Sequence, residues 1–349
     1  MATSPKAEVL STHTPVLFEA AVQRAATLLR AGELVALPTE TVYGLAANAF
    51  DSVAVARIYE VKGRPARNPI IVHVASKELA QRCVRYWPEA AGRLAAAFWP
   101  GPLTLVLPQS HLIPDVVTAG GDTVGVRWPS HPFMQAVIRE CGFPLAAPSA
   151  NVSNQLSPTN AEHVHRALGG RIPLIIDGGQ SQVGIESTVV DLTVTPPRML
   201  RPGMIHAASL AAVVGELEIQ NPESRIQNSR PLRSPGQLPQ HYAPKARLAV
   251  FSWRNDAELS AQLSTLGSRP DSTHVIAHTH IPMAGGLGRV CVIPHDAEAF
   301  ARAIYAELHR CDEEGAELIV VEALPPGHEW QGIANRLARA VTPIDANHE

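Results

Sequence analysis

The chain has 349 residues, of which 30 are proline and 46% are hydrophobic, and its formal net charge is −3. At about 150 residues per domain, this length predicts two domains, and the apolar content excludes a disordered chain. The slightly negative net charge excludes an overall positive electrostatic potential that would attract a nucleic-acid backbone. A local basic patch remains possible.

The four cysteines form no CxxC pair, and the sequence has neither a signal-peptide core nor an apolar run of membrane-spanning length. We therefore expect a cytoplasmic protein with free thiols and no membrane contact.

The first two thirds of the sequence alternate helical and strand-like patterns, which predicts an α/β domain. One helix has clear ends, because Asp51 can cap its start and Gly63 can end it. The predicted helices span Pro15–Arg30, Ser52–Lys62, Lys77–Val84, Glu89–Phe98, Pro132–Glu140 and Ala161–Leu168. The predicted strands span Leu34–Leu37, Ile70–Val74, Leu103–Leu107, Thr123–Arg127, Leu145–Ala147, Leu174–Ile176, Ser187–Leu192 and Arg198–Leu200.

The pattern is lost between Glu216 and Pro244, where five prolines lie among Asn, Ser and Gln. This composition is typical of a linker. A second α/β rhythm follows, so we predict domains at residues 1–215 and 246–349, joined by a proline-rich linker at 216–245. The second rhythm comprises strands at Leu248–Phe251, Thr273–Ala277, Val290–Ile293 and Leu318–Val321, and a helix at Ala297–Arg310.

Five short segments combine polar side chains with prolines or glycines, a composition typical of rigid binding loops. Lys62, Arg64 and Arg67 suit phosphate oxygens, although Lys62 could simply complement a helix dipole. A buried Arg127 would need an anionic partner, either internal or bound. Turns, helix caps and a core histidine are the structural alternatives for these residues. The five segments are Pro38–Leu45, Lys62–Pro69, Thr123–Pro129, Ala147–Thr159 and Asp177–Asp191.

Several common catalytic motifs are missing: the sequence has no GxxxxGK[ST], no GxSxG and no HExxH. His274, His278 and His280 have a metal-like spacing, but strand geometry gives His274 no reason to converge with the other two. We therefore expect no protein metal site.

The order of the polar strings is more specific than any one of them. The series PTETVYGLA, KGRPARNPIIVHV, FWPGPLTLVLP, TVGVRWPSHP, PLAAPSANVSNQLSPT, DGGQSQVGIESTVVD and MLRPG resembles the YrdC/Sua5 family of L-threonylcarbamoyladenylate synthases. This resemblance runs from about Leu28 to Ile205. The string SPGQLPQHYAPKARL resembles the linker of the longer, Sua5-type members, and GIANRLARA resembles the close of their small Sua5 domain.

The resemblance implies a twisted YrdC-like α/β domain with a large cavity, followed by a smaller Rossmann-like α/β Sua5 domain. The implied enzyme is a nucleotidyltransferase that condenses L-threonine, bicarbonate or CO2, and ATP to threonylcarbamoyl-AMP and pyrophosphate, with Mg²⁺ accompanying the ATP. The product would pass to the downstream threonylcarbamoyl transferase machinery, which modifies tRNA next to the anticodon. A weak contact with tRNA or double-stranded RNA is also implied.

The family's site residues carry over position by position, and Lys62 and Arg64 would be the catalytic pair. Tyr242, which lies between Pro239 and Pro244, would act as a lid over the nucleotide. The threonine side would comprise Thr41, His73, Arg127, Ala147 and Ser187. The ATP side would comprise Arg64, Asn68, Thr123, Ser149, Ser157, Arg201 and Tyr242.

Two other functions stay open. One is a non-catalytic YrdC-type module that binds double-stranded RNA or ribosomes, against which the net charge of −3 argues. The other is a carbamoyltransferase-related enzyme, whose relatives carry further large domains for which 349 residues leave no room.

Overall fold

The computed structural model describes residues 6–220, 233–235, 242–283 and 285–342. The chain divides into two compact units, Met1–Ser153 with Ser157–Leu238, and Asn154–Leu156 with Pro239–Glu349. The predicted domain limits stay predictions, because most of the predicted linker lies outside the described residues.

A mixed sheet of eleven described strands forms the frame of the first unit, in the order β1-β8-β2-β3-β7-β4-β6-β5-β9-β10-β11. Around β2, Leu34 and Ala36 belong to one apolar cluster, whereas Val35 and Leu37 belong to another. Successive side chains of a strand point to opposite faces, so this run contributes to two cores. The strands are β1 (Glu8–Ser11), β2 (Val35–Leu37), β3 (Gly44–Asn48), β4 (Val72–His73), β5 (Leu103–Pro108), β6 (Thr123–Arg127), β7 (Leu145–Ala146), β8 (Leu174–Asp177), β9 (Thr188–Asp191), β10 (Arg198–Arg201) and β11 (Glu218–Ile219).

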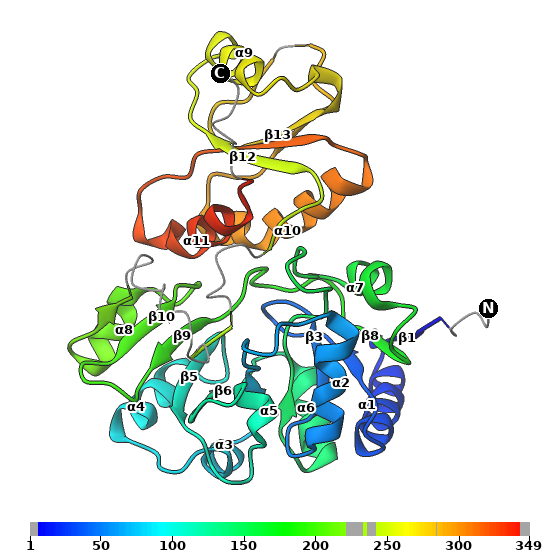
Figure 1. Cartoon of the computed structure of the whole chain (residues 1–349), viewed down its shortest axis with the longest axis vertical. Helices are drawn as coiled ribbons and strands as arrows, with labels where there is room; N and C mark the ends of the chain where they lie inside the picture. Colours follow the sequence, from blue (N-terminus) through cyan, green and yellow to red (C-terminus); the bar gives the residue numbers. More distant parts are fainter. Residues whose placement is uncertain (1–5, 221–232, 236–241, 284, 343–349) are drawn as a thin grey trace. The chain divides into compact units, whose positions relative to one another are not determined.

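Helices pack against this sheet (Figure 1). Helices α1 and α6 contact each other, with the Phe18 and Phe133 ring centroids 5.1 Å apart. The predicted ends of α2 are present, because the Asp51 carboxylate accepts the first N–H groups and Gly63 has a φ of 59°. The helices are α1 (Pro15–Arg30), α2 (Ser52–Lys62), α3 (Lys77–Cys83), α4 (Glu89–Phe98), α5 (Asp115–Thr118), α6 (Pro132–Cys141), α7 (Ala161–Leu168) and α8 (Ala207–Val214).

The segment Pro38–Leu45 differs from the prediction, which treated it as a loop throughout. Its last two residues begin β3, which pairs antiparallel with β2 so that Gly44 lies opposite Leu37. The residues of β3 are small and do not alternate in polarity, so tertiary pairing rather than local pattern makes this strand. Likewise, β11 lies inside the predicted linker and pairs in parallel with β10.

The second unit is built on a parallel four-stranded sheet in the order β12-β15-β13-β14. Helix α9 lies on one side of this sheet, and α10 and α11 lie on the other (Figure 1). The predicted α/β fold class is confirmed, because a large mixed sheet forms the first unit and a smaller parallel sheet forms the second. The elements are β12 (Arg247–Phe251), α9 (Asp256–Thr265), β13 (Thr273–Ala277), β14 (Arg289–Val292), α10 (Ala297–Glu313), β15 (Leu318–Glu322) and α11 (Gln331–Ala340).

Glu322 ties the ends of two strands of the second unit together. Its carboxylate accepts hydrogen bonds from the backbone N–H groups of His278, Thr279 and His280, which follow β13. Burial raises the pKa of Glu322, but these hydrogen bonds lower it by more, so the pKa is below the usual range. The polar loop after β13 is therefore anchored to the end of β15.

None of the described helices is long and apolar enough to cross a membrane.

Gly203 makes a close approach that a side chain would prevent. A Cβ at this position would lie 2.6 Å from the Thr188 backbone nitrogen and 2.9 Å from the Glu186 carbonyl oxygen. We expect Gly203→Ala to destabilise the chain by about 1–3 kcal/mol through overpacking, measured as a lower urea midpoint. Gly170→Ala is the matched control, because its added Cβ would meet nothing within 4 Å. Equal midpoints for the two variants would contradict this prediction.

Candidate active site

Arg127 is a buried cation at the end of β6, where its backbone lies opposite His73 of β4. Its Nη2 lies 2.7 Å from Glu40 Oε1, and its Nη1 donates to Thr41 Oγ1 at 2.9 Å. The side chains of Arg127 and Glu40 are only 4% and 6% exposed. The internal anionic partner that a buried Arg127 requires is therefore Glu40, from the segment between β2 and β3.

Hydrogen bonds fix the segment that carries Glu40. The Thr39 hydroxyl donates to the Val42 carbonyl at 2.6 Å, so Thr41 donates its own hydrogen to Thr39 Oγ1 at 2.9 Å. Farther along the chain, the N–H groups of Val183 and Gly184 donate to the carbonyls of Glu40 and Thr41. Thr41 can therefore only accept from Arg127, which fixes the direction of that hydrogen bond.

Three predicted site residues carry buried polar atoms without a hydrogen-bond partner among the described residues. These atoms are Asn68 Oδ1, His73 Nδ1 and two nitrogens of Arg127, namely Nε and Nη2, of which Nη2 makes the ion-pair contact with Glu40. Burial and, second, the charge of Arg127 lower the pKa of His73 to about 3, so its imidazole is neutral at physiological pH. Unpartnered buried atoms cost about 1–3 kcal/mol each, and such atoms are typical of positions that contact a ligand.

Lys62 is a predicted catalytic residue, but its ammonium is bound to the protein. Its Nζ donates to the carbonyl of Ser149 at 2.6 Å and to the carbonyl of Asn151. Burial and, second, the charge of Arg64 hold the pKa of Lys62 well below its usual value. Lys62 thus holds the loop after β7 against the end of α2.

Arg64 is positioned by backbone carbonyls of its own loop. Its Nε donates to the Asn68 carbonyl at 2.9 Å, and its Nη2 donates to the Pro69 carbonyl at 2.5 Å. The guanidinium also lies 6.0 Å from the ring centroid of Tyr59. The basic loop is therefore folded around Arg64 rather than extended into solvent.

Ser187 joins residues that the sequence assigned to different substrates. Its hydroxyl lies 2.8 Å from Thr104 Oγ1 and accepts from Arg201 Nη2 at 3.2 Å, while its carbonyl accepts from Arg201 Nε at 3.0 Å. One residue earlier, Glu186 accepts from the Ser157 hydroxyl at 2.5 Å. The threonine-side residue Ser187 and the nucleotide-side residues Arg201 and Ser157 are therefore neighbours.

Three further predicted residues lie around these groups. The Ala147 N–H donates to the Ile71 carbonyl at 3.1 Å, and the Ser149 hydroxyl donates to Asn151 Oδ1 at 2.6 Å. Thr123 begins the strand that Arg127 ends, so the two residues are about 13 Å apart on one face of β6.

Tyr242 belongs to the second compact unit. It is 1% exposed, its ring centroid lies 6.1 Å from that of Tyr305, and Arg336 lies over its ring at 5.6 Å. Its φ of 66° is in the left-handed region, which is uncommon for a bulky side chain. Its predicted contact with the nucleotide stays a prediction.

Glu40, Thr104 and Glu186 were not among the predicted site residues. Thr104 was detectable as a hydroxyl residue inside the apolar run Leu103–Leu107. Glu40 and Glu186 each lie beside a predicted residue, but the sequence does not indicate which cation or hydroxyl each one meets.

Comparisons with known proteins cover both units. A family model described as "Telomere recombination" matches residues 27–203, and one described as "Threonylcarbamoyl-AMP synthase, C-terminal domain" matches residues 205–342. A threonylcarbamoyl-AMP synthase of Pyrococcus abyssi is 41% identical over 325 residues, which cover 91% of this chain and 93% of the relative. A threonylcarbamoyl-AMP synthase of Bacillus subtilis is 40% identical over 340 residues, which cover 95% of this chain and 94% of the relative.

A solved structure agrees with these matches. The crystal structure of P. abyssi Sua5 complexed with L-threonine has a TM-score of 0.86 and 39% identity, over 95% of this chain and 98% of that chain. The resemblance inferred from the ordered motifs is confirmed, and the chain belongs to the Sua5/YrdC family of two-domain threonylcarbamoyl-AMP synthases.

Proposed function

We propose that this chain condenses L-threonine, bicarbonate or CO2, and ATP to threonylcarbamoyl-AMP and pyrophosphate. The observation that carries this proposal is the buried and fixed Arg127, in a chain 41% identical to a threonylcarbamoyl-AMP synthase over 91% of its length. A fold alone would not assign the substrate, but this site offers a cation suited to an amino-acid carboxylate.

Threonine is proposed to bind between Arg127, Thr41 and Ser187. The free Nε of Arg127 and its charge suit the substrate carboxylate, which would compete with Glu40 for the guanidinium. The hydroxyls of Thr41 and Ser187 suit the threonine hydroxyl, which would help to reject valine more than serine. His73 is neutral and would contribute a hydrogen bond rather than a charge.

ATP is proposed to bind on the side of Arg64, Asn68 and Arg201, with Thr123, Ser149 and Ser157 as polar contacts. Arg64 and Arg201 are held by backbone carbonyls, so they are preorganised to meet phosphate charge. We propose that Lys62 supports this side by holding the loop at Ser149, because its ammonium already meets two carbonyls.

The reaction needs no covalent enzyme nucleophile. The threonine amine would capture CO2 as a carbamate, and a carbamate oxygen would then attack the α-phosphorus of ATP. The bond from that phosphorus to the bridging oxygen would break, and its electron pair would leave with pyrophosphate. Fixed cations and neighbouring sites supply what these steps require, namely proximity and charge stabilisation.

Mg²⁺ is expected to accompany ATP. No three His, Cys, Asp or Glu side chains of the described residues come together as a metal site. We therefore propose that phosphates and water, rather than a carboxylate cage, hold this Mg²⁺. The product would pass to a transferase that acts on tRNA.

A mass-spectrometric assay for threonylcarbamoyl-AMP tests the proposed function. Product should form only when ATP, threonine and bicarbonate are all present. We expect Arg64→Ala to abolish most product and Arg127→Lys to raise the KM for threonine about 10- to 100-fold, because the bidentate contact is lost. Arg198→Ala is the control, because its ion pair with Glu218 is on the surface. RNA binding without any product would instead favour the non-catalytic module.

The ion pair between Arg127 and Glu40 makes a separate prediction about stability. Arg127→Met should destabilise the chain by about 3–5 kcal/mol, because the Glu40 carboxylate is left buried without a partner. Adding Glu40→Gln should restore part of this loss, and urea unfolding measures both changes. Breaking the exposed pair Arg198–Glu218 should cost less than about 1 kcal/mol. Similar losses of stability at both ion pairs would contradict the prediction that the buried pair Arg127–Glu40 contributes more.

Tyr242 is proposed as a nucleotide contact and lid from the linker. Tyr242→Ala should weaken ATP binding and raise hydrolysis of the labile product, measured by calorimetry and product decay. Tyr242→Phe keeps the ring against Tyr305 but lacks the hydroxyl. Comparing it with Tyr242→Ala therefore separates the effect of ring packing from that of the hydroxyl. Tyr86→Ala is the control, because that side chain is exposed. Unchanged ATP affinity and product lifetime in Tyr242→Ala would contradict the proposed role of Tyr242 as a lid.

A further inference from the structure

Thr104 is a buried hydroxyl residue inside the apolar strand β5, and its side chain is 0% exposed. Burying a hydroxyl costs free energy unless it forms a hydrogen bond, so a threonine at this position needs a partner. Among the described residues, its hydroxyl bonds only to Ser187 Oγ, at 2.8 Å. Thr104 therefore lies directly behind a residue that is proposed to bind the substrate.

The register of the sheet places Thr104 on the face that carries Arg127. In the antiparallel pair of β5 and β6, Val106 lies opposite Gly125. Opposite residues share a face of a sheet, and so do residues two apart in one strand. Thr104 is therefore on the same side of the sheet as Gly125 and Arg127, which is the side proposed to receive the threonine carboxylate.

Gly125 leaves room for the methyl group of Thr104. A Cβ at Gly125 would lie 3.2 Å from Thr104 Cγ2. A β-branched side chain has few favourable χ1 angles, so the position of its methyl group also decides the position of its hydroxyl. The packing of this methyl group thus helps to hold the Thr104 hydroxyl against Ser187.

The hydrogen-bond roles of Ser187 follow from its two neighbours. The Arg201 guanidinium can only donate, so Ser187 Oγ accepts from Arg201 Nη2 at 3.2 Å. The Thr104 hydroxyl has no other acceptor among the described residues, so its hydrogen also goes to Ser187 Oγ. Both lone pairs of Ser187 Oγ are then occupied. Its own hydrogen is left to be donated to a ligand.

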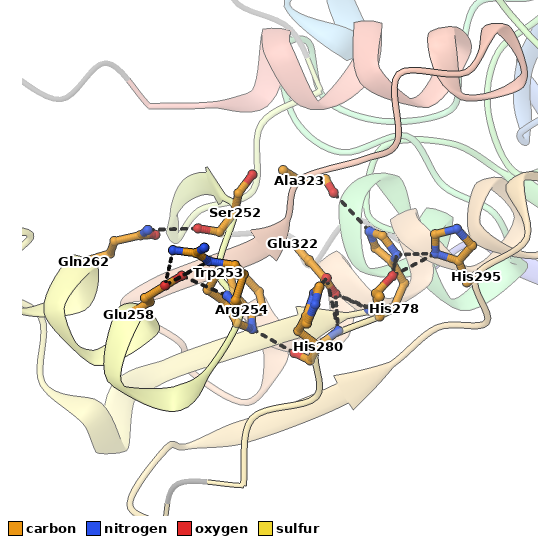
Figure 2. Close-up of polar contacts among 11 residues, drawn as sticks. Ser252, Trp253, Arg254, Glu258, Gln262, His278, His280, His295, Glu322 and Ala323 are labelled. Atoms are coloured by element: carbon orange, nitrogen blue, oxygen red, sulfur yellow. Dashed lines mark hydrogen bonds and ion pairs between the residues drawn. The ribbon is translucent and has the colours of Figure 1, made fainter.

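A polar cluster of the second unit shows a different arrangement. At the carboxyl end of its sheet, Glu322 lies 2.9 Å from His280 Nδ1, and the Nδ1 atoms of His278 and His295 are 2.8 Å apart (Figure 2). These groups meet partners within their own unit. The hydrogen of Ser187 has no such acceptor among the described residues, so we expect a substrate to provide it.

We propose that Thr104 is a positioning residue, which occupies an acceptor site of Ser187 and turns the Ser187 hydrogen toward the hydroxyl of the threonine substrate. This inference rests on the proposed binding of threonine at Ser187. Thr41 would play the complementary part, because its own hydrogen goes to Thr39 and it can only accept. A substrate hydroxyl can accept from Ser187 and donate to Thr41, whereas a methyl group can do neither.

Calorimetric titration of the full chain with L-threonine and with L-2-aminobutyrate tests the proposal. The second ligand has a hydrogen in place of the hydroxyl, so the unaltered chain should bind threonine more tightly. Thr104→Val should reduce the ratio of the two affinities about 3- to 10-fold, because Ser187 loses a donor and meets a bulkier methyl group. Thr104→Ser keeps the hydroxyl and should keep most of the ratio. A general loss of stability would weaken the binding of both ligands alike.

Thr118→Val is the matched control, because Thr118 is a buried threonine of the first unit that bonds to the backbone carbonyls of Asp115 and Gly121. It should leave the ratio unchanged. Circular dichroism checks that each variant folds. If Thr104→Val does not fold, Thr104→Ala removes the same hydroxyl without adding a methyl group.

Ser187→Ala separates this inference from the proposed function. A reduced ratio in Ser187→Ala, together with an unchanged ratio when the Thr104 hydroxyl is removed, would overturn the role of Thr104 alone. An unchanged ratio in both variants would overturn the proposed role of Ser187 as well. A ratio that falls in Thr104→Val and is kept in Thr104→Ser would establish the positioning role.

Discussion

The Arg127 guanidinium cannot give up its charge, so its place in the buried sheet depends on a carboxylate that reaches it. Glu40 provides that carboxylate from a segment 87 positions earlier in the sequence, and Thr41 adds a hydrogen bond. The connection between β2 and β3 must therefore fold onto the end of β6. The loop at Val183 and Gly184 donates two backbone hydrogen bonds to the same connection, so it is held against it.

Proline carbonyls recur where the site loops meet. The Tyr43 and Leu45 N–H groups donate to the carbonyls of Pro158 and Pro148, and the Thr188 N–H donates to that of Pro102. A proline has a fixed φ and no N–H of its own, so it offers an acceptor at low entropic cost. The proposed mechanism uses no covalent nucleophile and would depend on such rigid positioning, which gives the high proline content of the sequence a structural meaning.

Signals in the local sequence predicted the helices more accurately than they predicted the tertiary contacts. The helix at Ser52–Lys62 was predicted to the residue, because Asp51 and Gly63 mark its ends within the segment itself. The pairing of Arg127 with Glu40 was not predictable, since strand order in this sheet does not follow the sequence. The same limit applies to His278 and His295, which follow neighbouring strands and meet only in the fold. Family motifs supplied the predicted site residues, but not Thr104 or Glu186, whose contacts with Ser187 and Ser157 appear only in the fold.

The side chains proposed to bind threonine include few groups that can gain or lose a proton. The hydroxyls of Thr41 and Ser187 do not ionise near neutral pH, the guanidinium of Arg127 stays charged, and burial beside that cation lowers the pKa of His73 to about 3. No side chain in this group changes its charge between pH 5 and 8. Under the proposed roles, the pH dependence of carbamate formation comes from the threonine amine, which must be unprotonated to capture CO2. These four side chains thus keep a constant charge, and under the proposed roles the substrate carries the acid–base chemistry.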